Sequence, residues 1–471
     1  MLKRSCKHES DEGSPLTFPK ELLPFVLNAP LPVLVRSTLE WMLKRATLDE
    51  LFEQTAQDQY TRELTLTFLV DLMLDVASGI QPSALKAFNA RATDLAVSRQ
   101  ALYAKLRRME PAVSAAVVGQ LATLAGQAIE HLGSCHGEPI PGYQARVVDG
   151  TVLGGRCEHR IKPLRNLWSA GLTAHALAVY APAQRTVRQV VLDEDAYSGE
   201  RTLLYQLQVE AGELWIADRN FCARPFLFRL HRARGVFLMR WHGRSCPFDA
   251  IEPLHAAHNT VQGALEQAVW LEDPESQERL QVRRIVLPLA APTRNGDTEL
   301  ILMTNLPDTV AADQICDAYR DRWTIETHFQ RLTQQLHCEP STLSYPRAAL
   351  FAFAMAVSAG NALAVVQQAL QDAHGEDAVT ELSYYAVVLE ISQIWLGMAI
   401  VMPTEKWKFI RHCRLDEFIA WLRYVAQHVR MDRFKRSRRG PKKPQTKKPM
   451  DKNNLQFHVS IKRLLDQNKT P

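Results

Sequence analysis

The hydrophobic pattern changes its period along the chain, and this change most constrains the fold. From about Pro32 to Leu132, apolar residues recur at three- and four-residue spacing, which is typical of amphipathic helices. Beyond Pro141, short runs rich in β-branched residues alternate with helical stretches, and residues 346–430 return to the helical pattern. Because strands and helices mixed in this way form an α/β layer, the sequence predicts an α/β core between two all-α regions.

These patterns divide the 471 residues into four segments. Residues 1–135 are expected to form a helical region, and residues 140–345 an α/β domain with a β-rich insertion at about 243–296. Residues 346–430 are expected to be helical again, and residues 431–471 to be a basic tail. A chain of this length can bury a large hydrophobic core without disulfide bonds.

Positive charge is concentrated near the C-terminus. The whole chain carries a formal charge of +5, but residues 430–448 alone carry +9, so the rest is slightly acidic at −4. A base-rich segment without apolar residues is typical of a disordered tail that contacts a polyanion. We expect Arg436, Arg438 and Arg439 of this tail to bind DNA.

The cysteines and the N-terminus predict a cytoplasmic protein. The eight cysteines are dilute and form no C-x-x-C pair, which is typical of a reducing compartment, and residues 1–14 lack the apolar stretch of a signal peptide. The most apolar segment, residues 348–370, is interrupted by polar residues such as Ser358 and Asn361. Because a spanning helix needs about 20 predominantly apolar residues, we predict a buried core helix and no membrane association.

The segment Ser98–Met109 is a candidate for direct contact with DNA. Ser98 is a predicted N-cap, and the apolar positions after it fall on one stripe of the helix. The stripe leaves five polar or basic residues pointing outward: Arg99, Gln100, Tyr103, Lys105 and Arg108. With the short helix before it, this helix would suit a helix-turn-helix reader of the major groove. An ordinary solvated amphipathic helix would show the same pattern.

Two aspartates stand out because they follow predicted strands. Asp149 comes directly after a strand over residues 145–148, and Asp218 directly after a strand over residues 214–217. In an α/β sheet, strand ends deliver side chains from a rigid backbone to a cleft. These two acids are therefore candidates for a shared site.

A third acid, Glu326, lies on a predicted long helix from Val310 to Gln335. At 3.6 residues per turn, Tyr319, Arg322 and Glu326 share one face of that helix, within about 60° of arc. Three carboxylates with hard oxygen donors suit Mg²⁺ or Mn²⁺, and two such ions could act on a phosphodiester. The same spacing would also arise from unrelated acids and an ordinary Arg–Glu pair on a helix surface.

Three blocks of the sequence resemble DDE transposases of the insertion-sequence-four family. The blocks are VVDGT at residues 147–151, ADRNF at residues 217–221, and the Y-x2-R-x3-E pattern of Tyr319, Arg322 and Glu326. Their order and wide spacing agree with the family, and so does the β-rich insertion before the third acid. The resemblance covers roughly residues 60–430. The family pattern ends in a lysine where this chain has Thr333.

The resemblance implies an RNase H-like core in which Asp149, Asp218 and Glu326 bind two Mg²⁺ or Mn²⁺ ions. It implies cleavage of double-stranded DNA at the inverted-repeat ends of a mobile element, followed by strand transfer into target DNA. Tyr319 and Arg322 would position DNA phosphates near the cleaved bond. The resemblance further implies a homodimer on paired ends and a nucleoid-associated location, with the N-terminal helices recognising the repeats.

Two alternatives to a transposase stay open at the level of the sequence. A metal-dependent nuclease of the same fold would cleave DNA without joining strands. A catalytically impaired remnant would only bind DNA, and Thr333 gives this alternative some weight because the family lysine contacts a DNA phosphate. The presence of all three acids favours an enzyme.

Overall fold

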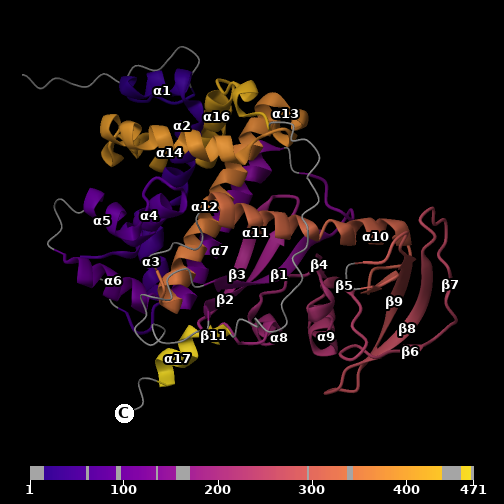
Figure 1. Cartoon of the computed structure of the whole chain (residues 1–471). Coiled ribbons are helices and arrows are strands. Elements are labelled where there is room, and N and C mark those ends of the chain that lie inside the picture. The colour runs from indigo at the N-terminus through magenta and orange to yellow at the C-terminus, as the bar shows by residue number, and fades with distance from the viewer. Residues whose placement is uncertain are drawn as a thin grey trace, which may run out of the picture.

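A computed structural model of the chain describes residues 15–59, 63–91, 97–133, 136–154, 170–293, 296–336, 343–436 and 458–467. It confirms a mixed α/β protein with a central mixed sheet and a large helical content (Figure 1). The N-terminal helices and the strands β6–β9 lie on opposite sides of the sheet's centre (Figure 1).

The N-terminal part of the chain is helical, as its period predicts. The helices are α1 (Leu23–Asn28), α2 (Pro30–Met42), α3 (Arg45–Thr55), α4 (Leu66–Ala77), α5 (Ala84–Arg91), α6 (Arg99–Arg108) and α7 (Pro111–Leu132). The predicted cap of α6 is confirmed, because the Ser98 hydroxyl accepts a hydrogen bond from the Ala101 backbone N–H at 3.2 Å. Gly133 ends α7 with a φ of 80°, a conformation that favours glycine.

Eleven described strands form one sheet. They are β1 (Gln144–Gly154), β2 (Ala170–Ala181), β3 (Thr186–Asp193), β4 (Glu213–Ala217), β5 (Val236–Arg240), β6 (Asp249–Ala250), β7 (His255–Ala256), β8 (Leu265–Glu272), β9 (Arg279–Pro288), β10 (Glu299–Thr304) and β11 (His458–Ser460). The order is β11-β2-β1-β4-β5-β10-β9-β8-β6, with β3 beside β2 and β7 beside β8. The pairs β1–β4 and β4–β5 are parallel, whereas β1–β2 is antiparallel. Strands β6–β9 fall within the predicted insertion.

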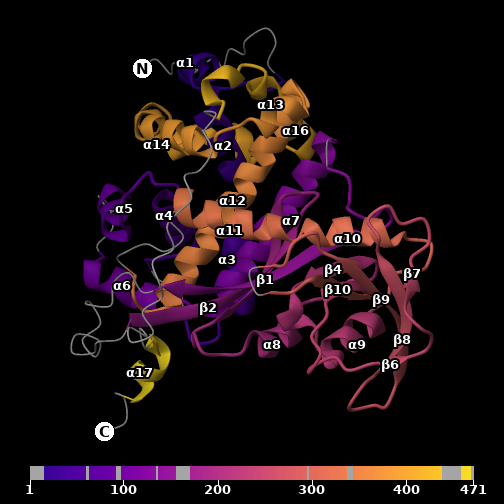
Figure 2. The ribbon, with the colours of Figure 1, turned by 45° about the vertical axis from the view of Figure 1, so that its right-hand side comes forward.

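The other helices cover the sheet and fill the C-terminal part of the chain. They are α8 (Glu200–Leu203), α9 (Arg224–Arg232), α10 (Ala312–Arg320), α11 (Trp323–Gln335), α12 (Pro346–His374), α13 (Glu376–Thr380), α14 (Tyr384–Val401), α15 (Lys408–Arg411), α16 (Leu415–Ala426) and α17 (Ile461–Gln467). Helices α10 and α11 lie over one face of the sheet, and α8 and α9 over the other (Figure 2).

Strand β1 carries side chains into two separate cores. Val147 packs into the core shared with α7, α11 and α12, whereas Val148 packs into the core shared with α9. Because side chains alternate along a strand, Asp149 lies on the Val147 face and Gly150 on the Val148 face. The carboxylate of Asp149 is thereby directed toward the face that α11 covers.

The structure corrects the expectation of one continuous helix over residues 310–335. Residues Asp321 and Arg322 separate α10 from α11, although both keep right-handed helical dihedral angles. The break arises because backbone N–H groups bond to the third preceding carbonyl there, as in the 3.1 Å bond from the Arg322 N–H to the Tyr319 carbonyl. Tyr319 and Glu326 therefore belong to two helices, with Arg322 at the junction.

The structure also corrects the extent of the basic tail. Residues 458–467 are folded, because β11 pairs in parallel with β2 from His458 to Ser460 and α17 follows directly. Ile461, at the start of α17, is fully buried. Apolar residues such as Val459 and Ile461 give this part of the chain surface to bury, which the preceding basic residues lack.

Helix α12 confirms the predicted buried helix at residues 348–370. By length and composition alone, three described helices could cross a membrane: Pro111–Leu132, Pro346–His374 and Tyr384–Val401. In the most apolar window of α12, 94% of the residues are buried inside the protein, against 22% in that of α14. The apolar composition of α12 is therefore accounted for by its place in the core.

Asn361 of α12 fastens this helix to the edge strand β3. Its amide accepts a hydrogen bond from the Val187 N–H at 2.8 Å and donates one to the Val187 carbonyl at 2.9 Å, with the side chain fully buried. We expect Asn361→Leu to lower the free energy of unfolding by about 2–6 kcal/mol, because each unpaired buried polar group costs about 1–3 kcal/mol.

Urea unfolding measures this loss, with Ser358→Ala as the matched control on the same helix. The Ser358 hydroxyl bonds only to the Ala354 carbonyl of its own helix, at 2.9 Å, so its removal should change the unfolding midpoint little. Equal midpoints for the two variants would contradict the fastening role of Asn361.

Candidate active site

Asp149 and Asp218 each directly follow the last paired residues of β1 and β4. Val148 of β1 pairs with Ala217 of β4 in parallel register, so the next residue of each strand is an aspartate. The prediction that β1 ends at Asp149 is wrong, because antiparallel pairing with β2 carries β1 on to Gly154. Paired neighbours on adjacent strands lie about 5 Å apart, which brings the two carboxyl groups into one site.

Arg322 joins the third acid to this pair of aspartates. Its Nη2 donates to the Glu326 Oε1 at 2.9 Å, and its charge acts directly on Asp149. The Arg322 side chain is only 10% exposed, whereas that of Glu326 is 47% exposed. The buried guanidinium therefore interacts with acids from both α11 and β1.

Asp218 and Glu326 both act electrostatically on Asp149. Burial raises the pKa of Asp149 from 3.8 to about 6. The charges of Asp218 and Glu326 add to this rise, whereas Arg322 and the Gly150 N–H oppose it. A buried carboxyl group with two acidic neighbours has a strong preference for a nearby cation.

Tyr319 is a further candidate residue beside Arg322. Its ring is 6% exposed, and burial raises the pKa of its phenol to about 12, so it stays a hydrogen-bond donor at neutral pH. Burial alone would lower the pKa of Arg322, but the charges of Tyr319, Glu326 and Asp149 raise it. The site thus combines a neutral phenol and a permanent cation beside three acids.

The acids have the donor chemistry of a magnesium site, but Glu326 is paired with the guanidinium of Arg322. Among the described residues, no three His, Cys, Asp or Glu side chains are close enough together to hold one metal ion. Asp149 has Asp218 and Glu326 as its charged acidic neighbours, so pairs of carboxylates that share Asp149 are the available ligand sets. Carboxylate oxygens are the ligands that Mg²⁺ prefers, and the residues fit the ion in this respect.

Glu200 of α8 is a fourth acid at the site, which the sequence analysis did not find. Its Oε2 accepts a hydrogen bond from the Asn220 amide, while the Asn220 backbone N–H donates to the Asp218 Oδ1 at 2.7 Å. The buried His175 lies behind it, with Nε2 at 3.6 Å from the Glu200 Oε1. Glu200 therefore supports the turn that carries Asp218, from the sheet face opposite α11.

The contact between Glu200 and Gly150 explains why glycine follows the first aspartate. A Cβ atom at position 150 would lie 2.2 Å from the Glu200 Oε1. We expect Gly150→Ala to lower the free energy of unfolding by about 1–3 kcal/mol, as overpacking in a core does. The melting temperature of the purified variant measures this loss.

A double-mutant cycle isolates this contact. If Glu200 is the group displaced, Gly150→Ala should cost much less stability in a Glu200→Ala background, giving an interaction energy of about 0.5–3 kcal/mol. Strictly additive losses would place the strain of Gly150→Ala elsewhere.

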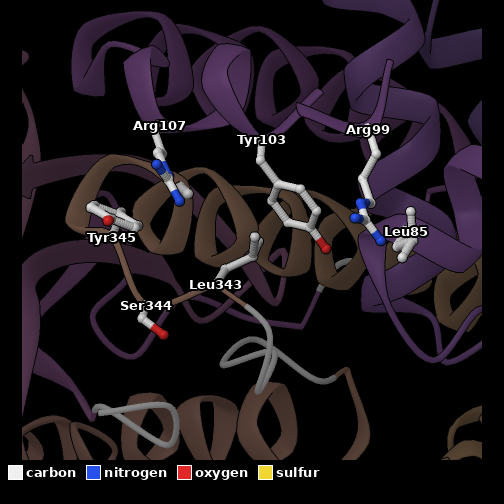
Figure 3. Close-up of a pocket in the computed structure, with 8 residues that line it drawn as sticks. Leu85, Arg99, Tyr103, Arg107, Leu343, Ser344 and Tyr345 are labelled. Carbon is white, nitrogen blue, oxygen red and sulfur yellow. The ribbon is translucent and has the colours of Figure 1, made fainter. Parts of the chain in front are cut away.

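The five residues of α6 that were predicted to contact DNA do not share one surface. Arg99 and Tyr103 line a pocket together with Arg107 (Figure 3), and Gln100 and Arg108 are exposed. Lys105 instead packs over the ring of Phe52, with its Nζ 4.9 Å from the centroid, and burial lowers the pKa of this lysine. Of the five, Arg99, Gln100 and Arg108 are exposed as predicted, whereas Tyr103 and Lys105 are half-buried.

The predicted contacts of the tail are only partly described. Arg436 is exposed, but its Nε donates to the Leu382 carbonyl at 2.8 Å, which ties the start of the tail to the C-terminal helices. Arg438 and Arg439 lie outside the described residues, and so does the side chain of Thr333.

Fold and site together describe an α/β domain in which two neighbouring strands and one helix each carry an acid of the candidate site. Residues 140–361 match the family model of the transposase DDE domain, and this region contains Asp149, Asp218 and Glu326. The matched region is a little less than half of the chain and supports a DDE transposase.

A solved structure and the curated proteins were also compared with the chain. A cryo-EM structure of a piggyBac transposase synaptic complex with hairpin DNA is 11% identical, with a TM-score of 0.36. The similarity covers 83% of this chain and 81% of that chain. No curated protein matches the sequence.

Proposed function

We propose that this protein is a metal-dependent DDE transposase of the insertion-sequence-four family with an RNase H-like core. It cleaves DNA at the inverted-repeat ends of a mobile element and transfers the freed strands into target DNA. The observation that supports the proposal most is that Arg322, Asp218 and Glu326 all act on the charge of Asp149, inside the region that matches the transposase DDE domain.

In this proposal Asp149 is shared between two divalent ions, Mg²⁺ or Mn²⁺. Asp218 would complete one pair of ligands and Glu326 the other, which agrees with the acidic neighbours of Asp149. When bound, such ions supply an activated water and stabilise the departing 3′ oxygen of a phosphodiester. Arg322 bonds to the Oε1 of Glu326, so Glu326 could ligate an ion through its other carboxylate oxygen or by releasing the guanidinium.

The residues around the acids would position the DNA backbone. Once Glu326 turns to a metal, the guanidinium of Arg322 can bind a phosphate through two parallel hydrogen bonds. The protonated Tyr319 phenol can donate a further hydrogen bond to the same strand. Positioning of this kind supplies much of the rate in phosphoryl transfer.

DNA recognition falls to other parts of the chain in this proposal. The exposed Gln100 and Arg108 of α6 would contact the inverted repeats, and the basic segment with Arg436, Arg438 and Arg439 would add contacts to phosphates. A homodimer on paired ends would bring two active sites to the two ends of the element. The proposed location is the bacterial cytoplasm.

Cleavage of the element's own ends tests the proposal. The full chain is incubated with Mg²⁺, a target plasmid, and DNA that carries the inverted repeats flanking the gene. We expect nicks at the repeat ends and joining of the new 3′ ends to the target. Cleavage without joining would indicate the nuclease, and binding without cleavage would indicate the remnant.

The contribution of the tail is tested by substitution rather than truncation, because residues 458–467 belong to the sheet. We expect Arg438→Gln with Arg439→Gln to lower the slope of log affinity against log salt by about 0.9 for each DNA phosphate that the tail no longer neutralises. Filter binding between 50 and about 200 mM salt measures the slope. An unchanged slope would exclude these two residues as phosphate ligands.

A further inference from the structure

Helix α6 turns three side chains into a pocket against the start of α12 (Figure 3). Arg99, Tyr103 and Arg107 recur at every fourth position, which places them on one side of the helix. The rest of the lining consists of Leu85, Leu343, Ser344, Tyr345 and Ala348. The cavity has a volume of about 310 Å³.

The described residues that line the pocket include two arginines and no acid. Neither Arg99 nor Arg107 makes an ion pair with another residue in the described part of the chain. The guanidinium of Arg107 stacks over the ring of Tyr345, 4.0 Å from its centroid. An anion that enters this pocket would therefore meet two guanidinium groups without displacing an internal partner.

A second cavity of similar size shows what a compensated site looks like in this protein. It has a volume of about 320 Å³, and three of its four arginines are paired with its own acids. Arg91 pairs with Asp75 at 2.5 Å, and Arg411 pairs with Glu40 at 2.6 Å. The contrast marks the pocket beside α6 as the one with charge available for a ligand.

Size and chemistry restrict the ligand to part of a single nucleic-acid strand. The volume is at the lower end for small-molecule sites, and it is far too small for a duplex. Arginines beside aromatic rings are the combination with which proteins hold unpaired strands, through phosphate contacts and base stacking. Arg99 and Arg107 lie about 12 Å apart along α6, so they can reach phosphates on either side of one nucleotide.

The pocket lies at the same end of the sheet as the acids. Arg347, next to its lining, donates to the Glu194 carboxylate at 2.7 Å, directly after β3. At that end of the sheet, Asp193 of β3 pairs with His175 of β2. His175 in turn pairs with Val152 of β1, which follows Asp149 in the same strand. A strand that leaves the site around Asp149 toward this end of the sheet would run toward the pocket.

We propose that this pocket binds one unpaired nucleotide of a DNA strand, with the Tyr103 ring against the base and Arg99 and Arg107 toward the flanking phosphates. The inference rests on the proposed function, because it takes DNA as the substrate. In this proposal Arg99 and Tyr103 hold a strand whose base pairs are open, instead of contacting bases in the major groove of a duplex.

Fluorescence of 2-aminopurine tests this proposal with the full chain in the absence of divalent metal, so that no cleavage occurs. The probe is a duplex with one unpaired 2-aminopurine nucleotide, compared with the fully paired duplex and with free 2-aminopurine deoxynucleotide. We expect the protein to quench only the unpaired probe. Tyr103→Leu and Arg99→Gln should each weaken its binding about tenfold or more, and Tyr103→Phe should retain it.

Lys86→Gln is the matched control, because it removes one exposed positive charge from the neighbouring helix α5 outside the pocket. It should leave the quenching unchanged, and thermal melting should show that all variants are folded. Wild-type affinity for the unpaired probe in Tyr103→Leu and Arg99→Gln would overturn the proposal. An equal loss of affinity for the paired duplex in these variants would also overturn it, and so would binding of the free nucleotide at the same residues. Each of these results concerns the pocket alone and is compatible with cleavage of the element's ends. A failure of the proposed function would instead be seen as wild-type protein that does not cleave those ends.

Discussion

Glu326→Gln is expected to abolish Mg²⁺-dependent cleavage of the element's ends while leaving binding of those ends within about threefold of wild type. The amide keeps the size of the side chain and can still accept the hydrogen bond from Arg322, which is 2.9 Å long in the wild-type protein. It removes the negative charge that a metal ligand needs. Because a bound ion contributes several kcal/mol to the transition state and each 1.36 kcal/mol is tenfold in rate, the loss should be at least about 10³-fold.

The control for this variant is Asp317→Asn on α10. Asp317 is 60% exposed and pairs with Arg320 on the surface, so its charge should not matter for cleavage. Gel-based cleavage assays with radiolabelled ends, run beside gel-shift assays, separate chemistry from binding. Retained cleavage in Glu326→Gln would remove Glu326 from the catalytic set, and parallel loss of binding would show a structural defect instead.

Asp149→Asn is expected to inactivate the enzyme and, in metal-free buffer, to stabilise its fold at neutral pH. The folded protein holds the Asp149 proton more tightly than the unfolded chain, because burial raises the pKa from 3.8 to about 6. Stability of the wild type therefore falls as the pH rises from 3.8 to about 6, and the full deficit is present above that pH. The difference between the two pKa values corresponds to about 3 kcal/mol.

The neutral amide that Asp149→Asn introduces would remove this deficit. We expect a gain of about 1–3 kcal/mol in the free energy of unfolding at pH 8, which shrinks toward zero below pH 4. Urea unfolding in EDTA at both pH values measures the gain. A variant that is less stable than wild type at pH 8 would show that Arg322 already compensates the Asp149 charge.

The sequence predicts those parts of the fold and site that depend on neighbours in the chain. The strand around Val148 and the Ser98 cap follow from local composition, and the structure contains both. The buried helix at residues 348–370 follows from its apolar length. The sequence could predict that Asp149 and Asp218 share a site, because the ends of parallel strands meet at one edge of a sheet. The extension of β1 beyond Asp149 comes from its pairing with β2.

Features that depend on tertiary contacts could not be predicted from local pattern. Glu200 has no motif of its own, and its place beside Gly150 and Asn220 comes from the packing of α8 on the sheet. Lys105 looks like an outward residue on a helical wheel, but Phe52 from a different helix covers it. The break at Arg322 changes hydrogen-bond partners without leaving helical dihedral angles, so no glycine or proline marks it.

The assignment of three acids to one metal-dependent site is the central claim. Crystals of the full chain soaked in Mn²⁺ test it most directly, because anomalous scattering locates the ion independently of activity. The account predicts Mn²⁺ bound to Asp149 together with Asp218 or Glu326. No Mn²⁺ at Asp149 at saturating metal would contradict it.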